Sequence, residues 1–286
     1  MLQNAQRIFI ENQLNLKIID AISLSGGDIN DVFKVETNKE NIVLKINDRN
    51  RFPKMLEKEF RALDFLKDAS KAKYPSPIAH FTDEESQYLA MKFVEEGSNS
   101  HKGQKLLGEH LADQHKCTHE SFGWEEDNYI GSLPQPNSFK STWSDFYAEN
   151  RILYQTKMAF DKGIINKDVL AKTERFCSKI DEIFPKESPA LLHGDLWGGN
   201  YFIDKEEQPL FYDPAVYYGH REIDIAMTRL FGGFSAEFYE SYNQSFPLEK
   251  GWENRIQYGQ LYPNLVHLNL FGVGYLGSVL DVVGRF

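Results

Sequence analysis

The segment that most constrains how this 286-residue chain can fold lies between residues 191 and 214. An apolar pair leads into a His-Gly-Asp triplet at residues 193–195, and Asn200 follows the aspartate by five positions. Two short apolar stretches then flank a polar turn, and the second stretch ends at Asp213. This pattern predicts a loop that feeds a β-hairpin. Because a hairpin returns the chain to the edge where it began, we expect Asp213 to lie close to Asn200.

Three oxygen-bearing side chains, Asp195, Asn200 and Asp213, would then converge. Such oxygens suit Mg²⁺, which fills its remaining positions with water and phosphate oxygens. Phosphoryl transfer needs that metal ion and a carboxylate directed at the attacking hydroxyl. The H-x-D-x-x-x-x-N spacing with a later Asp is typical of kinase catalytic loops, although Gly194 replaces the Arg of protein kinases. The alternative is an ordinary polar loop and hairpin, which the upstream features make less favourable.

A strand, a glycine turn and a second strand are predicted near the N-terminus, around Gly26 and Gly27. Glycine lets backbone N–H groups approach the phosphates of a nucleotide closely. The turn lacks the Gly-Lys-Ser/Thr sequence that opens the helix of a Walker A loop. Taken alone, the glycine pair is better explained by a plain tight hairpin.

Lys45 lies within an apolar stretch, residues 42–46, that predicts a strand. It could occupy a solvated face, since alternate residues of a strand point outward. The functional interpretation is a lysine that holds the α- and β-phosphates and is fixed by a helix glutamate. Residues 54–66 have a helical pattern that turns Glu59 partly toward the apolar face. We therefore expect a Lys45–Glu59 pair, with Glu57 as the alternative partner.

A further hairpin is predicted ahead of a polar, glycine-containing stretch at residues 95–100. We place a lobe boundary in this stretch, between an N-terminal lobe of residues 1–96 and a C-terminal lobe of residues 97–286. Crevices between lobes are frequent ligand sites. We expect an adenine ring in this crevice, where it would form hydrogen bonds with the backbone of Met91, Lys92, Phe93 and Val94.

Beyond residue 100 the pattern is mainly helical. Helices are predicted over residues 142–162 and 167–184, and another begins at Glu222 with acidic residues in its first turn. Residues 122–140 are rich in Gly, Pro and Asn but also in aromatic residues, which indicates a functional loop rather than disorder. Protein kinases dock a polypeptide with a segment that ends in Ala-Pro-Glu, and no such triplet follows Asp213. A small-molecule substrate is therefore expected.

A zinc site is the alternative raised by His110, His115, Cys117 and His119. His115 and His119 share a helix face, but His110 and His115 do not. No second group of ligands completes a tetrahedral set. A histidine that ends the helix is the preferred interpretation of His115.

Charge and cysteine content exclude several classes of function. The net charge of −10 disfavours a nucleic-acid partner. Two cysteines without a CxxC motif are typical of a reducing compartment, so we expect a cytoplasmic protein. The longest weakly polar region, residues 261–283, is interrupted by polar residues, Pro and Gly, and no membrane span or membrane partner is expected.

These motifs together resemble the fructosamine kinase (ketosamine kinase) family, within the aminoglycoside- and choline-kinase-like group. His-Gly-Asp alone would indicate the broad group, whereas His-Gly-Asp-Leu-Trp-Gly-Gly-Asn with Phe-Gly-Gly-Phe is specific to the family. The resemblance covers nearly the whole chain, and the matching positions are residues 25–30, 43–45, 59, 127–131, 134–137, 192–200, 212–215, 218–222 and 230–234.

The resemblance implies an α+β, bilobal protein-kinase-like fold, with a small antiparallel-sheet N-lobe and a larger, mostly helical C-lobe. It also implies ATP and Mg²⁺ as cofactors. Asp195 would be the catalytic base, Asn200 and Asp213 would hold Mg²⁺, and Lys45 with Glu59 would order the phosphates.

Further residues carried over by the resemblance belong to the nucleotide and sugar sites. Gly26, Gly27 and Asn30 would contact the nucleotide. Trp197 would stack on the sugar, and His267 could line the same site, although its surroundings match the family less well. Some family members carry Cys where this chain has Asp28, so the thiol-based redox control linked to that Cys should not be assumed.

The implied reaction is ATP-dependent phosphorylation of the 3-hydroxyl of a ketosamine, the rearranged adduct of a sugar with an amine. A 3-phosphoketosamine is prone to eliminate phosphate and release the amine, so the biological role would be deglycation. Two alternatives are a kinase of another small alcohol, such as choline, an aminoglycoside or a sugar, and a non-catalytic nucleotide-binding protein. Free and protein-bound ketosamines both fit as substrates, and the sequence makes no prediction of oligomeric state.

Overall fold

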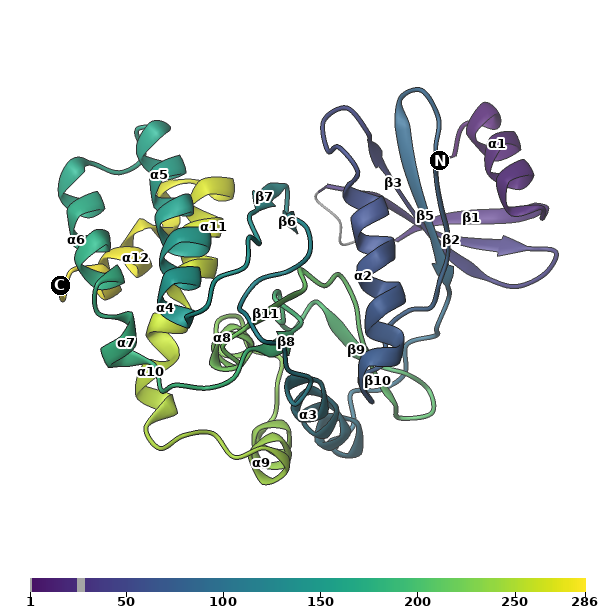
Figure 1. The fold of residues 1–286 in the computed structure, drawn as a ribbon. Coiled ribbons are helices and arrows are strands. Elements are labelled where there is room, and N and C mark those ends of the chain that lie inside the picture. Colours follow the sequence, from purple (N-terminus) through teal and green to yellow (C-terminus); the bar gives the residue numbers. More distant parts are fainter. Residues whose placement is uncertain (1, 25–28) are drawn as a thin grey trace.

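The computed structural model describes residues 2–24 and 29–286 (Figure 1). A β-sheet with two helices forms one lobe, and helices dominate the other, with short two-stranded sheets between them. The predicted bilobal α+β architecture is confirmed. Among the described residues, no helix combines the length and the apolar character needed to cross a membrane.

The N-terminal lobe is built on a five-stranded antiparallel sheet in the order β1-β2-β3-β5-β4. Its strands are β1 (Ile18–Leu24), β2 (Asp31–Thr37), β3 (Ile42–Asp48), β4 (Pro77–Thr82) and β5 (Ser86–Lys92). Successive side chains of a strand point to opposite faces. Ile42 and Leu44 of β3 accordingly pack in the core that includes Ile10 of α1 (Asn4–Leu14). Val43 and Lys45 face the other side of the sheet, where α2 (Met55–Ala69) lies.

Helix α2 follows from an apolar pattern with helical spacing. Its buried side chains are Met55, Leu56, Ala62, Leu63 and Leu66. The helix begins one residue later than predicted and continues to Ala69. Burying this face fixes α2 against the sheet and directs Glu59 toward Lys45.

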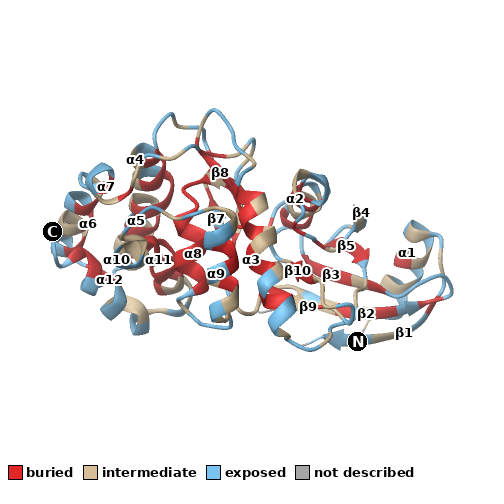
Figure 2. Ribbon diagram, turned by 90° about the horizontal axis from the view of Figure 1, so that it is seen from below, coloured by how far each residue is buried: buried red, intermediate tan, exposed pale blue. Residues whose placement is uncertain are grey.

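The middle of the molecule consists of α3 (His101–His115), α8 (Glu222–Thr228), α9 (Ala236–Ser245) and two short strand pairs. The pairs are β8 (Ala190–Leu192) with β11 (Tyr217–Gly219), and β9 (Tyr201–Ile203) with β10 (Pro209–Phe211). The β9–β10 pair confirms the predicted hairpin. One core cluster extends from α2 through β8 and β10 to α3 and α9, so the lobes share buried apolar contacts (Figure 2).

The helical lobe contains most of the remaining elements, which surround a second large core. They are α4 (Trp143–Phe146), α5 (Tyr154–Asp161), α6 (Lys167–Cys177), α7 (Ile180–Ile183), α10 (Trp252–Gly259), α11 (Leu261–Phe271), η2 (Val273–Tyr275) and α12 (Leu276–Val283).

Three of the predicted segments in this lobe differ from the structure in detail. The run predicted as one helix over residues 142–162 is continuous, but a π-helical segment (Tyr147–Leu153) joins α4 to α5. The helix predicted over residues 167–184 is interrupted between α6 and α7. The long loop of residues 122–140 contains a hairpin of β6 (Asn128–Ile130) and β7 (Leu133–Gln135).

Candidate active site

Asp195, Asn200 and Asp213 line one cavity of about 450 Å³. Asp195 and Asn200 belong to the loop between β8 and β9, and Asp213 follows β10. The hairpin returns the chain as the sequence predicts, because the Tyr212 amide donates a hydrogen bond to the Asn200 carbonyl over 3.0 Å. The cavity walls include residues of α2 and of α11, so it lies between the two lobes.

The side chain of Asn200 is oriented by the loop that carries Asp195. Its Nδ2 donates to the Asp195 carbonyl over 2.8 Å and to Asp195 Oδ2 over 3.2 Å. Within the described residues, Asn200 Oδ1 and Asp213 Oδ2 have no hydrogen-bond partner. An amide oxygen and a carboxylate oxygen on the wall of one cavity are ligands that suit Mg²⁺. The donor set therefore fits the predicted metal ion.

A tight turn at His193 and Gly194 presents Asp195 to the cavity. Gly194 has a φ of +84°, and a Cβ atom there would lie 2.1 Å from the Ala215 carbonyl oxygen. The Asp195 amide donates to His193 Nδ1 over 3.2 Å, so the opposite Nε2–H donates to the Tyr212 carbonyl over 2.9 Å. Burial lowers the pKa of His193, which favours this neutral tautomer. The turn is thereby tied to the segment that follows β10.

Asp224 supports the same turn, and sequence reasoning did not identify it. From α8, its two carboxylate oxygens accept the backbone N–H groups of His193 over 2.7 Å and Gly194 over 2.9 Å. Its Oδ2 also lies 3.1 Å from Nε2 of His115, whose Nδ1 is 2.8 Å from the Tyr242 hydroxyl. One signal for Asp224 is present in the sequence. It is the acidic first turn of the predicted helix, which we relate to the helix dipole alone.

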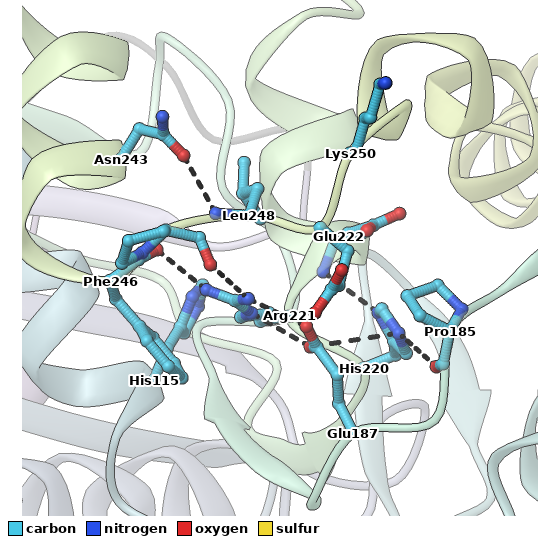
Figure 3. Close-up of polar contacts among 12 residues, drawn as sticks. His115, Pro185, Glu187, His220, Arg221, Glu222, Asn243, Phe246, Leu248 and Lys250 are labelled. Carbon is cyan, nitrogen blue, oxygen red and sulfur yellow. Dashed lines mark hydrogen bonds and ion pairs between the residues drawn. The ribbon is translucent and has the colours of Figure 1, made fainter.

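A polar network fixes the start of α8 (Figure 3). Arg221 donates through Nε and Nη2 to both carboxylate oxygens of Glu187, over 2.9 and 2.7 Å, and through Nη1 to the Phe246 carbonyl over 2.8 Å. Figure 3 shows these groups converging on the guanidinium from separate segments. Because Asp224 lies one turn further along α8, the network also fixes the position of that carboxylate.

The environment of Asp195 prepares its carboxylate to accept a proton near neutral pH. Burial raises the pKa of Asp195 to about 7, the negative charge of Asp213 adds to the effect, and the hydrogen bond from Asn200 opposes it. A general base is most effective when its pKa lies near the working pH.

Lys45 joins the two lobes through its ammonium group. Its Nζ donates to Glu59 Oε1 over 2.6 Å and also to Asp213 Oδ1. The expected Lys45–Glu59 contact is confirmed, whereas Glu57 pairs with Arg61. Burial alone would lower the pKa of Lys45, but Asp213 and Glu59 together raise it above its ordinary value. The buried ammonium therefore stays charged.

The predicted glycine turn is described only in part. Gly26 and Gly27 lie outside the described residues. Asn30 borders the cavity, and its Oδ1 accepts a hydrogen bond from Asn47 Nδ2 over 2.7 Å.

The residues predicted to contact adenine, Met91, Lys92, Phe93 and Val94, do not line the cavity that holds the three oxygen ligands. The amides of Lys92 and Phe93 already donate to backbone carbonyls of other segments. The Val94 amide has no partner among the residues that the structure describes. The adenine contact stays a prediction, and Val94 offers the donor for it.

An aromatic wall lies beside Asp195 in the cavity. Trp197, 39% exposed, contacts Phe231 edge to face at 5.9 Å, and Phe231 lies 5.1 Å from His267. All three side chains line the cavity. A Cβ atom at Gly233 would lie 2.8 Å from the Gly198 Cα, so the two glycine motifs contact each other directly. Phe231 was part of a matched motif, but sequence reasoning gave it no role in the site.

Comparison with known proteins identifies the family. The fructosamine kinase family model matches residues 1–286. A candidate ketoamine kinase from Enterococcus faecium is 39% identical over 280 residues, covering 96% of this chain and 97% of that protein. The chloroplastic protein-ribulosamine 3-kinase of Arabidopsis thaliana is 37% identical over 271 residues, covering 92% of this chain and 81% of that protein.

Solved structures agree with this assignment. The crystal structure of a candidate fructosamine-3-kinase from Thermobifida fusca has a TM-score of 0.89 at 30% identity, covering 99% of this chain and 98% of that one. A spectinomycin phosphotransferase bound to ADP and spectinomycin has a TM-score of 0.65 at 14% identity, covering 97% of this chain and 89% of that one, which is a likeness of fold. With a family model that spans every residue and relatives well above 30% identity, the chain belongs to the fructosamine kinase family.

Proposed function

We propose that this protein transfers the γ-phosphate of ATP to the 3-hydroxyl of a ketosamine. The observation that carries the proposal is a cavity in which Asp195 lies beside the oxygen ligands of Asn200 and Asp213, with the Lys45 ammonium on the same wall. Family membership supports the class of acceptor, because relatives named as ketoamine and protein-ribulosamine kinases match nearly the whole chain.

In the proposed mechanism, Asp195 takes the proton from the 3-hydroxyl. The oxygen then bonds to the γ-phosphorus, and the bond from that phosphorus to the ADP oxygen breaks. Mg²⁺ held by Asn200 and Asp213 would neutralise charge on the phosphate oxygens. The buried Lys45 supplies a fixed positive charge for the nucleotide phosphates, and Glu59 keeps its ammonium in place.

The proposed acceptor site is the aromatic wall. Trp197 is exposed enough for a sugar ring to stack on it, and Phe231 holds its indole from the side. His267 completes the wall from α11. The product, a 3-phosphoketosamine, would eliminate phosphate and release its amine, which gives the reaction a role in deglycation.

The lobe boundary and the cellular location are also part of the proposal. The division into lobes of residues 1–96 and 97–286 is supported by the sheet, which ends at Lys92, and by α3, which begins at His101. A cytoplasmic location is supported by Cys117 and Cys177, which are both free thiols.

The test is ATP consumption with Mg²⁺ against a panel of fructosamines, ribulosamines, choline and an aminoglycoside. We expect turnover of at least one ketosamine. Asp195→Asn should lower kcat by about 10²- to 10⁴-fold, the usual contribution of a general base. Asp161→Asn, on the exposed end of α5, is the matched control and should keep the wild-type rate.

The outcomes separate the competing hypotheses. Turnover of choline or the aminoglycoside without any ketosamine would overturn the acceptor assignment and leave the kinase chemistry in place. If ATP is bound but no acceptor is phosphorylated, the chain acts as a non-catalytic nucleotide-binding protein.

A further inference from the structure

Residues 124–137, here called the bridging segment, connect two parts of the site that are far apart in sequence. The segment contains the β6–β7 hairpin and lies between α2 and the helical lobe (Figure 1). Its residues Tyr129 and Ile130 also border the cavity.

One side of the bridging segment contacts α2 along most of that helix. Glu126 accepts two hydrogen bonds from Arg61, Nε to Oε1 over 2.8 Å and Nη2 to Oε2 over 2.7 Å. The Asp127 carbonyl accepts from Lys58 Nζ, and the Tyr129 hydroxyl donates to the Pro53 carbonyl over 3.0 Å. At the far end of the helix, the ring of Trp124 meets Phe65 edge to face at 5.1 Å. These contacts surround the turn of α2 that carries Glu59.

The other side of the bridging segment contacts the chain immediately after Asp213. Gln135 Nε2 donates to the Ala215 carbonyl over 3.1 Å, and Asn128 Nδ2 donates to the Val216 carbonyl over 2.9 Å. The bridging segment thus contacts both parts of the chain whose carboxylates bind Lys45. These are α2, which contains Glu59, and the segment after β10, which contains Asp213.

Buried polar groups make the bridging segment rigid. The side-chain oxygen Oδ1 of Asn128 accepts hydrogen bonds from Gln135 Nε2 over 2.7 Å and from Asn137 Nδ2 over 2.8 Å. Arg151, from the π-helical segment, donates to Asn137 Oδ1 over 2.7 Å, and the Tyr262 hydroxyl donates to Gln135 Oε1 over 2.7 Å. The side-chain amides of Asn128, Gln135 and Asn137 are all hydrogen-bonded, whereas Nε of Arg151 has no partner among the described residues. Satisfied buried amides of this kind rigidify a structure and specify one arrangement.

We propose that the bridging segment is a positioning element that holds Glu59 and Asp213 at the distance at which both bind Lys45. In protein kinases the lysine–glutamate pair and the metal-binding Asp must both be in place, and separate mobile elements control them. Here the bridging segment by itself contacts both α2 and the chain after Asp213, so one element keeps the nucleotide site assembled. The inference rests on the proposed nucleotide site but not on the identity of the acceptor.

The Arg61–Glu126 pair provides the test, because it touches neither the cavity nor Lys45. The probe is AMP-PNP with Mg²⁺, and its binding to the full chain is measured by calorimetry. Arg61→Glu and Glu126→Arg should each weaken binding by about fivefold, the upper range for one exposed ion pair. The double variant restores an opposite pair between α2 and the bridging segment, but not the pair of Arg61 with Glu57 within α2, and should recover most of the lost affinity.

Lys67→Glu is the matched control. Lys67 lies on the same helix with similar side-chain exposure, 41% against 44% for Arg61, but within the described residues it pairs only with Asp64 of its own helix. It should leave AMP-PNP affinity unchanged. Hydrogen exchange of residues 55–66 gives a second readout: it should be faster in each single variant and restored in the double variant.

The inference is overturned if the single variants bind as the wild type does, if Lys67→Glu has the same effect, or if the double variant shows no recovery. Failure of the proposed function is distinguishable. If the nucleotide site is wrong, the wild type itself does not bind AMP-PNP, and if only the acceptor is wrong, AMP-PNP binding and its response to the variants are unchanged.

Discussion

At the scale of single residues, the site depends on positions where one side chain or its absence decides the geometry. Gly194 combines a positive φ with a Cβ position that the Ala215 carbonyl already fills. His193 uses both ring nitrogens, one toward the Asp195 amide and the other toward the Tyr212 carbonyl. The triplet therefore sets the direction of Asp195, while burial and Asp213 set its pKa.

Gly194→Ala tests this geometry. The substitution adds left-handed strain of about 1–2 kcal/mol and a collision with backbone that cannot relax cheaply, so activity and stability should both fall sharply. Gly163→Ala is the matched control, because Gly163 has a φ of +70° with nothing within 4 Å of the added Cβ. In Gly163→Ala, urea unfolding should show the loss of stability from the left-handed strain alone, and kcat should be unchanged. Equal losses of stability in the two variants would contradict the role assigned to the Ala215 carbonyl.

At the scale of elements, α8 acts as the support of the catalytic loop. The network around Arg221 fixes its first turn, and Asp224 binds two consecutive backbone amides of the loop. A carboxylate can accept from both amides, since each of its oxygens is an acceptor. Through these contacts, α8 fixes the position of Asp195 relative to the helical lobe.

Asp224→Asn should weaken this support, because its amide group replaces one acceptor with a donor. We expect a loss of about 1–3 kcal/mol in the free energy of unfolding and a lower kcat at a temperature where the variant is folded. Glu222→Gln is the control, since Glu222 is buried on the same helix but pairs with Arg255. It should lose stability without a comparable loss of kcat. If the two variants lose activity in proportion to stability, Asp224 has no positioning role.

At the scale of the whole molecule, three of the connections that hold the lobes together lie around the cavity. They are the core cluster shared by α2, α3 and β10, the bridging segment, and the Lys45 contacts to Glu59 and Asp213. The Lys45 contact joins residues 168 positions apart in the chain. A nucleotide bound at this point would contact both lobes at once.

Lys45→Met should therefore act on nucleotide binding. Loss of hydrogen bonds to charged groups costs about 1.5–3 kcal/mol, so the Kd for AMP-PNP with Mg²⁺ should rise about ten- to hundredfold. Lys39→Met, in the exposed β2–β3 turn, removes the same charge away from the cavity and is the control. Equal Kd values for the wild type and Lys45→Met would show that the phosphates lie elsewhere.

The sequence by itself determined the features that follow from local patterns. Period-two alternation placed Lys45 on the face of β3 opposite Ile42 and Leu44, and helical spacing turned Glu59 toward it. The hairpin between Asn200 and Asp213 followed from a turn between two apolar stretches. These features depend on neighbours within a few residues, so the order of residues in the sequence is enough to predict them.

Only the tertiary structure decided which distant segments meet. Asp224, the bridging segment and the second contact of Lys45 with Asp213 depend on how separate elements pack. The hydrogen bonds of Asn128, Gln135 and Asn137 likewise join the bridging segment to the chain before β11 and to the π-helical segment. Such contacts leave no periodic pattern in the sequence, because each partner is selected by packing in three dimensions rather than by its spacing along the chain.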